Sequence, residues 1–126
     1  MPTTIMIVDK AVFVRKMFRF ALKGSVEALF LEAKDAAEAF EIAREHQGPI
    51  HLLISEVVMP GRMNGAKMAE RFCGIRPETK VLLMAGNAPE GATMKPNWHF
   101  ILMPLALSEI RESVGNILAP NYLVAC

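Results

Sequence analysis

Short apolar runs alternate with helix-like stretches along the whole chain, and this alternation constrains the fold more than any other feature. The first run, Ile5 to Val8, is continuously apolar, which is typical of a strand covered on both faces. The expected strands lie at 5–8, 28–33, 51–55, 80–84 and 100–103. The expected helices lie at 12–23, 36–47, 66–73 and 108–118. Strands that alternate with helices predict an α/β fold, in which a parallel sheet carries helices on both faces.

Residues that commonly begin or end helices support these boundaries. We expect Gly24 to end the first helix as a C-cap, Asp35 to cap the start of the second, and Ser108 to cap the start of the last. The region 85–99 breaks the pattern because it contains two glycines and two prolines. We expect a loop or one short helical turn there.

Length and composition indicate one domain over residues 1–126, with a C-terminal tail at about 119–126. Hydrophobic residues make up 52% of the chain, which is enough for a substantial core. No apolar run approaches the roughly 20 residues that a membrane span requires. The N-terminus lacks a basic region ahead of an apolar stretch, so no signal peptide is expected. These features predict a cytoplasmic protein without membrane contact.

The charges are nearly balanced, with 14 basic and 13 acidic residues and a net charge of +1, which argues against a nucleic-acid surface. The two cysteines have no paired spacing. We expect Cys73 to pack as a small apolar residue and Cys126 to be a free thiol, in a reducing cytoplasm. Trp98 and His99 are expected at the surface, and His51 as a packed residue. The apolar tail either packs back on the domain or forms an interface.

Several unusual residues follow the predicted strands, at the edge where open parallel sheets place their chemistry. Asp9 and Lys10 follow the first strand, Glu56 the third, Ala85 the fourth, and Met103 the fifth. Together with the loop from Met59-Pro60 to Asn64-Gly65, this layout resembles the receiver domain of two-component response regulators. The resemblance covers essentially the whole chain. It implies a flavodoxin-like (CheY-like), doubly wound, five-stranded parallel sheet in the order 2-1-3-4-5, with a shortened or irregular fourth helix.

The resemblance also implies a phosphoryl-transfer site. In the family, an Asp after the third strand attacks a phosphohistidine on a sensor kinase. Two acids after the first strand hold Mg²⁺, a Thr or Ser after the fourth strand bonds the phosphoryl group, and a Lys after the fifth pairs with it. In this chain only Asp9 matches the pattern. The four departures are Lys10 for the second acid, Glu56 for the nucleophile, Ala85 for the hydroxyl and Met103 for the lysine.

These departures act together. The Lys10 ammonium repels Mg²⁺, which requires oxygen ligands in near-octahedral geometry. Glu56 is one methylene longer than Asp, which moves its oxygens away from an in-line geometry. We therefore expect no enzymatic activity, no catalytic residues and lost or weak Mg²⁺ binding. Glu56 is expected to form an ion pair with Lys10. The alternatives are a carboxylate that imitates the phosphorylated state and residual acceptor activity.

The function expected from this resemblance is that of a stand-alone, atypical response regulator acting through phosphorylation-independent protein–protein contacts. By resemblance, its partner is a sensor histidine kinase or another signalling protein, or a second copy in a homodimer. The expected contact residues are Arg15, Lys16, Arg19, Lys23, Pro104 and Leu105. The basic residues of the first helix could equally form an ordinary solvated face. A small domain that binds an anion or nucleotide is the alternative of another class, but no glycine-rich loop follows the first strand.

Overall fold

The structure is a computed structural model that describes residues 2–59, 63–86, 95–103, 106–119 and 125–126. Its five strands form one parallel sheet in the order β2-β1-β3-β4-β5, which confirms the predicted topology. The strands are β1 (Thr3–Val8), β2 (Ala28–Ala33), β3 (Leu52–Glu56), β4 (Lys80–Ala85) and β5 (His99–Leu102). The helices are α1 (Val12–Leu22), α2 (Ala36–Glu45), α3 (Gly65–Ile75) and α4 (Leu107–Leu118).

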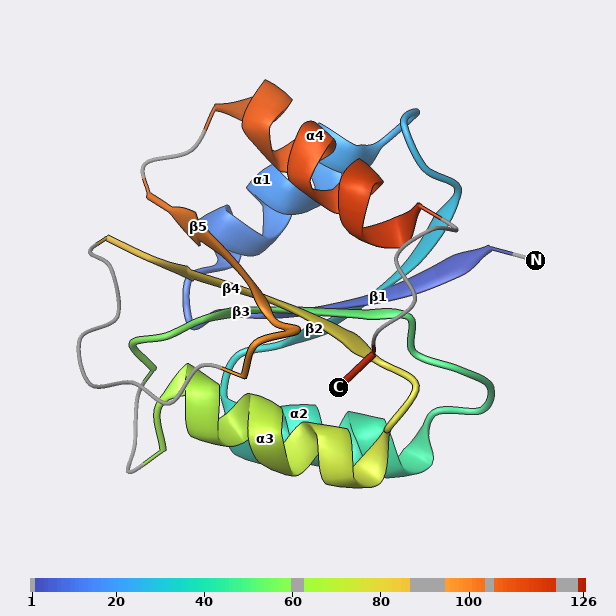
Figure 1. Ribbon diagram of the computed structural model, residues 1–126, viewed down its shortest axis with the longest axis vertical. Coiled ribbons are helices and arrows are strands. Elements are labelled where there is room, and N and C mark those ends of the chain that lie inside the picture. The colour runs from blue at the N-terminus through green and yellow to red at the C-terminus, as the bar shows by residue number, and fades with distance from the viewer. Residues whose placement is uncertain (1, 60–62, 87–94, 104–105, 120–124) are drawn as a thin grey trace.

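The helices form two layers, with α1 and α4 on one face of the sheet and α2 and α3 on the other (Figure 1). The three inner strands send alternate side chains into the two layers. Along β1, for example, Ile5 and Ile7 belong to the cluster under α1 and α4, whereas Met6 and Val8 belong to the cluster under α2 and α3. Burial on both faces explains why these strands are apolar without interruption.

The predicted helix ends are mostly found. Gly24 follows α1 with a φ of +84°, a conformation that glycine adopts without strain. The Asp35 carboxylate accepts a hydrogen bond from the Glu38 amide at 2.9 Å. The expectation for Ser108 is wrong, because this residue lies inside α4. The helix instead starts after Ala106, whose amide donates to the Glu109 carboxylate at 3.2 Å.

The structure corrects the expected position of Trp98. Its side chain is only 7% exposed and belongs to the apolar cluster under α2 and α3, because the residues before β5 turn toward the core. His99, the first residue of β5, is partly buried. The loop or short turn expected within 85–99 falls mainly on residues 87–94, which lie outside the described residues.

The expectation of free cysteines is also wrong. Cys73 of α3 forms a disulfide with Cys126, and their Cα atoms are 5.5 Å apart. Cys126 packs against the same apolar cluster as Trp98. Of the two alternatives for the tail, packing back on the domain is confirmed for Ala125 and Cys126, whereas residues 120–124 lie outside the described part of the chain. Among the described residues, no helix is long and apolar enough to cross a membrane.

Candidate functional site

Backbone hydrogen bonds bring four of the predicted site positions to one edge of the sheet. The Asp9 amide donates to Ala33 at 3.0 Å at the end of β1. The amide that follows Glu56 donates to Met84 at 2.8 Å, and the Met103 amide donates to Ala85 at 2.8 Å. Asp9, Glu56, Ala85 and Met103 therefore follow or end the neighbouring strands β1, β3, β4 and β5, at the carboxyl edge of the sheet.

Asp9 is a deeply buried charged residue at this edge, with 1% of its surface exposed. Its Oδ1 accepts a hydrogen bond from the Ala11 amide at 2.8 Å, and its carbonyl oxygen accepts one from Arg15 Nη1 at 2.5 Å. Its other carboxylate oxygen, Oδ2, is buried and has no hydrogen-bond partner. A buried carboxylate oxygen without a donor is costly, so this site is open to a proton or another donor.

Glu56 supplies such a donor when it is protonated. Burial raises the pKa of Glu56, and the Asp9 charge and a side-chain hydrogen bond with Asp9 raise it further, whereas the charge of Lys10 lowers it less strongly. Two carboxylates in contact repel each other, which is why the Asp9 charge contributes to the raised pKa of Glu56. Asp9 and Glu56 thus form a pair of contacting carboxyl groups at the ends of β1 and β3.

Lys10 does not occupy the position expected of it. Its side chain is exposed, and no ion pair joins it to Glu56 among the described residues. The predicted Lys10–Glu56 ion pair is therefore corrected to a contact between Glu56 and Asp9. The physical reason is that Asp9 is anchored at the end of β1 beside Glu56, whereas Lys10 lies one residue further and turns to solvent.

The start of α3 packs directly on the Glu56 backbone. A Cβ atom at Gly65 would lie 2.0 Å from the Glu56 carbonyl oxygen, so only glycine fits there. The Gly65 amide donates to Val57 at 2.7 Å, and Asn64 caps the helix by accepting from the Lys67 amide at 2.8 Å. The loop after β3 is thereby fixed at both ends, although residues 60–62 lie outside the described part.

The remaining two positions line the edge with apolar groups. Ala85 is 6% exposed and presents only a methyl group, and the partly buried Met103 packs on the apolar cluster under α1 and α4. Neither side chain carries an N–H or O–H group. A phosphoryl group at this edge would therefore find neither a hydroxyl donor nor an ammonium among these two side chains.

The donor set does not fit Mg²⁺. In the described part of the chain, no three His, Cys, Asp or Glu side chains lie close enough to hold a metal ion. Asp9 and Glu56 bring two carboxyl groups together, and the exposed Lys10 stands where the family pattern has another acid. A hard divalent cation requires several oxygen ligands in near-ideal geometry, which this pair alone does not offer.

The predicted basic surface on α1 divides into two parts. Arg15 and Arg19 each lie 3.0 Å from the Glu32 carboxylate on β2, so the two guanidinium groups share one negative charge. Lys16 and Lys23 are exposed. The sequence analysis missed Glu32, although a single charge within a predicted strand, opposite a basic helix, is a usable signal. Pro104 and Leu105, also expected at the surface for partners, lie outside the described residues.

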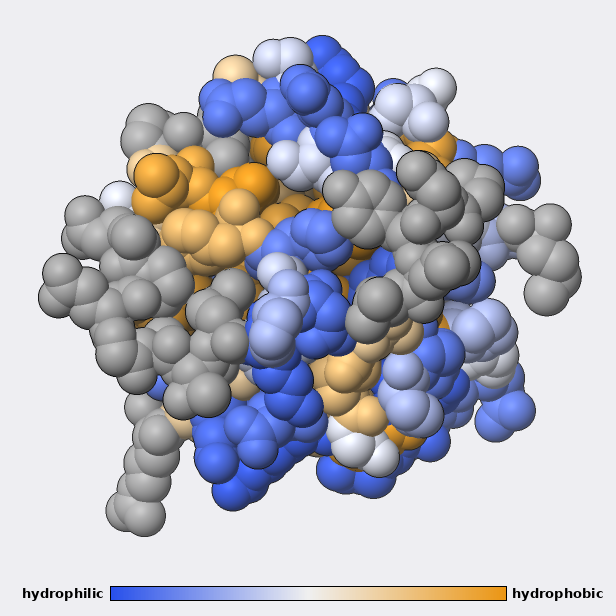
Figure 2. Space-filling model, viewed as in Figure 1, coloured by the Kyte–Doolittle hydropathy of each residue, from blue (hydrophilic) through white to orange (hydrophobic). Residues whose placement is uncertain are grey.

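Exposed apolar groups accompany Lys16 of α1 and Lys23, which directly follows this helix. Phe13 is 77% exposed and Phe20 67% exposed on the same helix. A groove of about 410 Å³ runs between α1 and β2, with basic and aromatic residues in its walls. A second apolar area lies at the carboxyl end of β5, where Leu102 is 54% exposed and where Figure 2 shows hydrophobic surface.

The doubly wound sheet with carboxyl groups at the ends of β1 and β3 defines an α/β domain whose site lies at the carboxyl edge. The profile of the response regulator receiver domain matches residues 5–113, and the chain therefore belongs to this family. Solved structures agree with this fold. The receiver domain of the hybrid histidine kinase CckA is 28% identical, with a TM-score of 0.77, over 92% of this chain and 99% of that one.

Two further structures show the same fold at lower identity. The chemotaxis response regulator CheY4 of Vibrio cholerae is 20% identical, with a TM-score of 0.74, over 94% of this chain and all of that one (100%). A two-component transcriptional regulator from Clostridium phytofermentans is 24% identical, with a TM-score of 0.77, over 90% of each chain. The chain is thus a receiver domain of two-component signalling.

Proposed function

We propose that this receiver acts in two-component signalling through protein–protein contacts that do not depend on phosphorylation. The observation that carries the proposal is the Asp9–Glu56 carboxyl pair. The residue at the nucleophile position is the longer Glu56, whose carboxyl group lies against the Asp9 carboxyl group instead of standing free, and burial and the Asp9 charge raise its pKa. The proposal includes weak or lost Mg²⁺ binding and no enzymatic activity.

The apolar lining supports the same proposal. A receiver that responds to phosphorylation needs groups that contact the added phosphoryl oxygens, and the Ala85 methyl and Met103 thioether cannot act as strong donors. The carboxyl edge can therefore hold one fixed arrangement, in which Asp9 and Glu56 contact each other and no added group is required. A fixed arrangement suits a protein that binds its partner constitutively.

A constitutively active form in which Glu56 imitates a phosphoryl group is the runner-up. Its position at the end of β3 favours this alternative, whereas Ala85 and Met103 lack the groups that would contact a phosphoryl oxygen or its imitation. Replacement of Glu56 by Gln tests it. Loss of partner binding in that variant would support the phosphomimetic role, and unchanged binding would support the phosphorylation-independent one.

The partner that we propose is a sensor histidine kinase or another signalling protein, with a homodimer as the alternative. The exposed Phe13 and Phe20, with Lys16 and Lys23, give α1 an apolar and basic outer surface, and Val12–Leu22 contains no acidic residue. An acidic surface with apolar groups would complement it. We propose a cytoplasmic location, in keeping with such partners, and no role in nucleic-acid binding.

The acceptor test uses a restored variant as its positive control. We expect the native chain, incubated with acetyl phosphate and Mg²⁺, to show no phosphoryl adduct by intact mass. Glu56→Asp alone should also stay unmodified. The quadruple variant Lys10→Asp, Glu56→Asp, Ala85→Thr and Met103→Lys should regain the adduct, because it restores the family pattern. An adduct on the native chain would overturn the proposal.

The partner test uses α1. We expect a pull-down from the native cytoplasm to recover a histidine kinase or another two-component protein, and the double variant Lys16→Glu, Lys23→Glu to recover much less. Lys67→Glu, an exposed lysine at the start of α3, is the matched control. A reproducible thermal stabilisation by a nucleotide panel would instead favour the anion- or nucleotide-binding alternative.

A further inference from the structure

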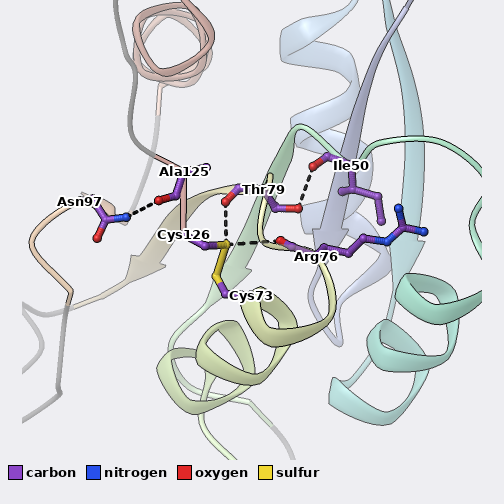
Figure 3. The surroundings of a disulfide bond; sticks show 7 residues. All are labelled: Ile50, Cys73, Arg76, Thr79, Asn97, Ala125 and Cys126. Atoms are coloured by element: carbon purple, nitrogen blue, oxygen red, sulfur yellow. Dashed lines mark hydrogen bonds between the residues drawn. A yellow bond between two sulfur atoms is a disulfide. The ribbon is translucent and has the colours of Figure 1, made fainter.

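The disulfide between Cys73 and Cys126 and two hydrogen bonds hold the C-terminal residues against α3 and against the segments that precede β4 and β5. Cys73 lies on α3, and the Cys126 amide donates to the Thr79 carbonyl at 2.8 Å, just before β4. The Asn97 side chain, which precedes β5, donates to the Ala125 carbonyl at 2.7 Å. Figure 3 shows the two sulfur atoms between α3 and the segment that carries Arg76 and Thr79.

We infer that Cys73 and Cys126 form a reversible thiol–disulfide site, in which Cys126 exchanges with small thiols and disulfides and Cys73 is the buried resolving sulfur. The two cysteines differ in accessibility. Cys73 is 7% exposed and belongs to the apolar cluster under α2 and α3, whereas Cys126 is partly exposed. A reagent in solution therefore reaches Cys126 first.

The surroundings of Cys126 accommodate the reduced state as well as the oxidised one. Its Sγ lies 2.7 Å from the Thr79 carbonyl oxygen and 3.5 Å from that of Arg76. A disulfide sulfur has no proton to donate, but a thiol at the same place can donate to either oxygen. Reduction therefore gives Cys126 a hydrogen-bond partner without requiring it to leave its site.

Two other contacts keep the sulfurs close together after reduction. The hydrogen bonds from the Cys126 amide to Thr79 and from Asn97 to Ala125 do not involve either sulfur. They hold the segment on the domain and so maintain a high effective concentration of one thiol beside the other. Reoxidation is then an intramolecular step, which favours a cycle over a one-way reduction.

A dithiol reduces the disulfide in two displacement steps. A thiolate of a dithiol attacks Cys126 Sγ, a new S–S bond forms, and the electron pair of the broken bond goes to Cys73 Sγ, which takes a proton. The second thiolate of the dithiol attacks the mixed disulfide, and Cys126 leaves as a thiolate that takes a proton. The dithiol is oxidised to its cyclic disulfide. With glutathione disulfide as the oxidant, the same steps run in reverse and release two molecules of glutathione.

The site-specific test compares the two single variants under glutathione disulfide, with intact mass as the readout. We expect Cys126 in the Cys73→Ser variant to form the mixed disulfide at least about ten-fold faster than Cys73 does in the Cys126→Ser variant. Equal rates, or faster modification of Cys73, would overturn the assignment of the exchanging sulfur. Cys73→Ala serves as a second background if the serine destabilises the apolar cluster.

The reversibility test uses the native chain, equilibrated in a series of glutathione buffers and then alkylated. We expect complete conversion between the unalkylated disulfide and the doubly alkylated dithiol, without intermolecular products. Trp98, the only tryptophan of the chain, lies in the same apolar cluster and should change its fluorescence on reduction. The Cys73→Ala variant should show no such change.

Thermal unfolding completes the test. Reduction should lower the Tm by on the order of 10 °C, because the bond closes a long loop across β4, β5 and α4. A dithiol that stays reduced in every buffer, or a disulfide that dithiothreitol cannot reduce in the folded protein, would overturn the proposal. Because no step involves Asp9 or Glu56, failure here leaves the proposed receiver function intact.

Discussion

The two ends of the sheet differ in how their charged and hydroxyl side chains are hydrogen-bonded. At the carboxyl edge, Asp9 Oδ2 is buried without a hydrogen-bond partner, and Glu56 shares its surroundings. At the amino edge, buried Thr79 donates to the Ile50 carbonyl at 2.7 Å, and the Thr4 amide donates to His51 Nδ1 at 2.9 Å. The carboxyl edge therefore retains an unsatisfied carboxylate oxygen, whereas the buried atom without a partner near the amino edge is the neutral Trp98 Nε1, just before β5.

Arg76 is the centre of the amino edge. Its guanidinium donates to the carbonyl oxygens of Ala43 at 2.8 Å, Gly48 at 2.6 Å and His46, which lie at the end of α2 and just after it. Glu78 lies 3.6 Å away and accepts a hydrogen bond from the Ile50 amide at 3.1 Å. Burial raises the pKa of Glu78, but the backbone hydrogen bonds and Arg76 outweigh it and lower the pKa overall.

The difference indicates which end of the sheet serves function and which serves stability. Unsatisfied groups and unfavourable electrostatics are concentrated at functional sites in α/β domains, whereas saturated hydrogen bonding indicates structural roles. Replacements at the amino edge should therefore lower stability. Replacements of the Asp9–Glu56 pair should instead preserve or raise it.

The largest effect is expected at the point where α3 meets the carboxyl edge. Gly65→Ala should lower the free energy of unfolding by about 3 kcal/mol, because its Cβ would overlap the Glu56 carbonyl oxygen. Gly74→Ala, on an open part of the same helix, is the control and should raise it by about 0.5–1 kcal/mol. Urea unfolding measures both. Equal effects would show that the close approach at Gly65 relaxes freely.

At the amino edge, Arg76→Met should cost about 2 kcal/mol, since it leaves the carbonyl oxygens after α2 without their donor while keeping the apolar stem. Arg71→Met, at an exposed position on α3, the helix that ends just before Arg76, should change stability by less than about 0.5 kcal/mol. Chemical denaturation distinguishes the two. A neutral Arg76→Met would remove the contrast between the two edges.

Thr79→Val should cost about 1 kcal/mol, because it retains the shape of the fully buried side chain and removes only the hydroxyl that donates to Ile50. Thr79→Ser, which keeps the hydroxyl, is the paired variant and separates the hydrogen bond from the lost methyl group. If Val were the more stable of the two, packing rather than hydrogen bonding would dominate at the amino edge.

The smallest effects are expected for the two glutamates, and they have opposite signs. The folded-state pKa of Glu56 is raised above 4.5, so its stabilising contribution is complete below pH 4.5 and is lost as the pH rises through the folded-state pKa. Glu56→Gln should therefore raise stability at neutral pH, by less than about 1 kcal/mol, and flatten this decline.

Glu78 behaves in the opposite way, because its folded-state pKa lies below 4.5. Its contribution is present above pH 4.5 and is lost as the pH falls through the folded-state pKa. Glu78→Gln should lower stability at neutral pH by less than about 1 kcal/mol, and the difference from the native chain should vanish in acid. Unfolding curves measured from acid to neutral pH test both; shifts of the same sign would contradict the pKa directions.

Local patterns were sufficient for most of the fold. Apolar runs and helical periodicity predicted all five strands and four helices, with boundaries that shift by one or two residues at most helix and strand ends. Apart from the local error at Ser108, the errors occurred where a residue's environment comes from distant segments. Trp98 has no periodic signal, and its burial depends on the cluster under α2 and α3.

The candidate site was predicted in position but not in its contacts. The strand ends correctly placed Asp9, Glu56, Ala85 and Met103 at one edge, because parallel strands end together. The choice between Lys10 and Asp9 as the neighbour of Glu56 depends on where two side chains point after their strands end. Sequence spacing carries no such information.

The sequence by itself determined the order of the helices and strands and the layered α/β class, because hydrophobic periodicity is a local property of the chain. It also located the departures from the family pattern at the carboxyl edge of the sheet. Only the tertiary structure decided that Glu56 contacts Asp9, that Arg15 and Arg19 share the Glu32 carboxylate, and that Cys73 is bonded to Cys126. Each of these joins residues far apart in the sequence. Their pairing depends on distances and directions that arise only once the sheet has formed.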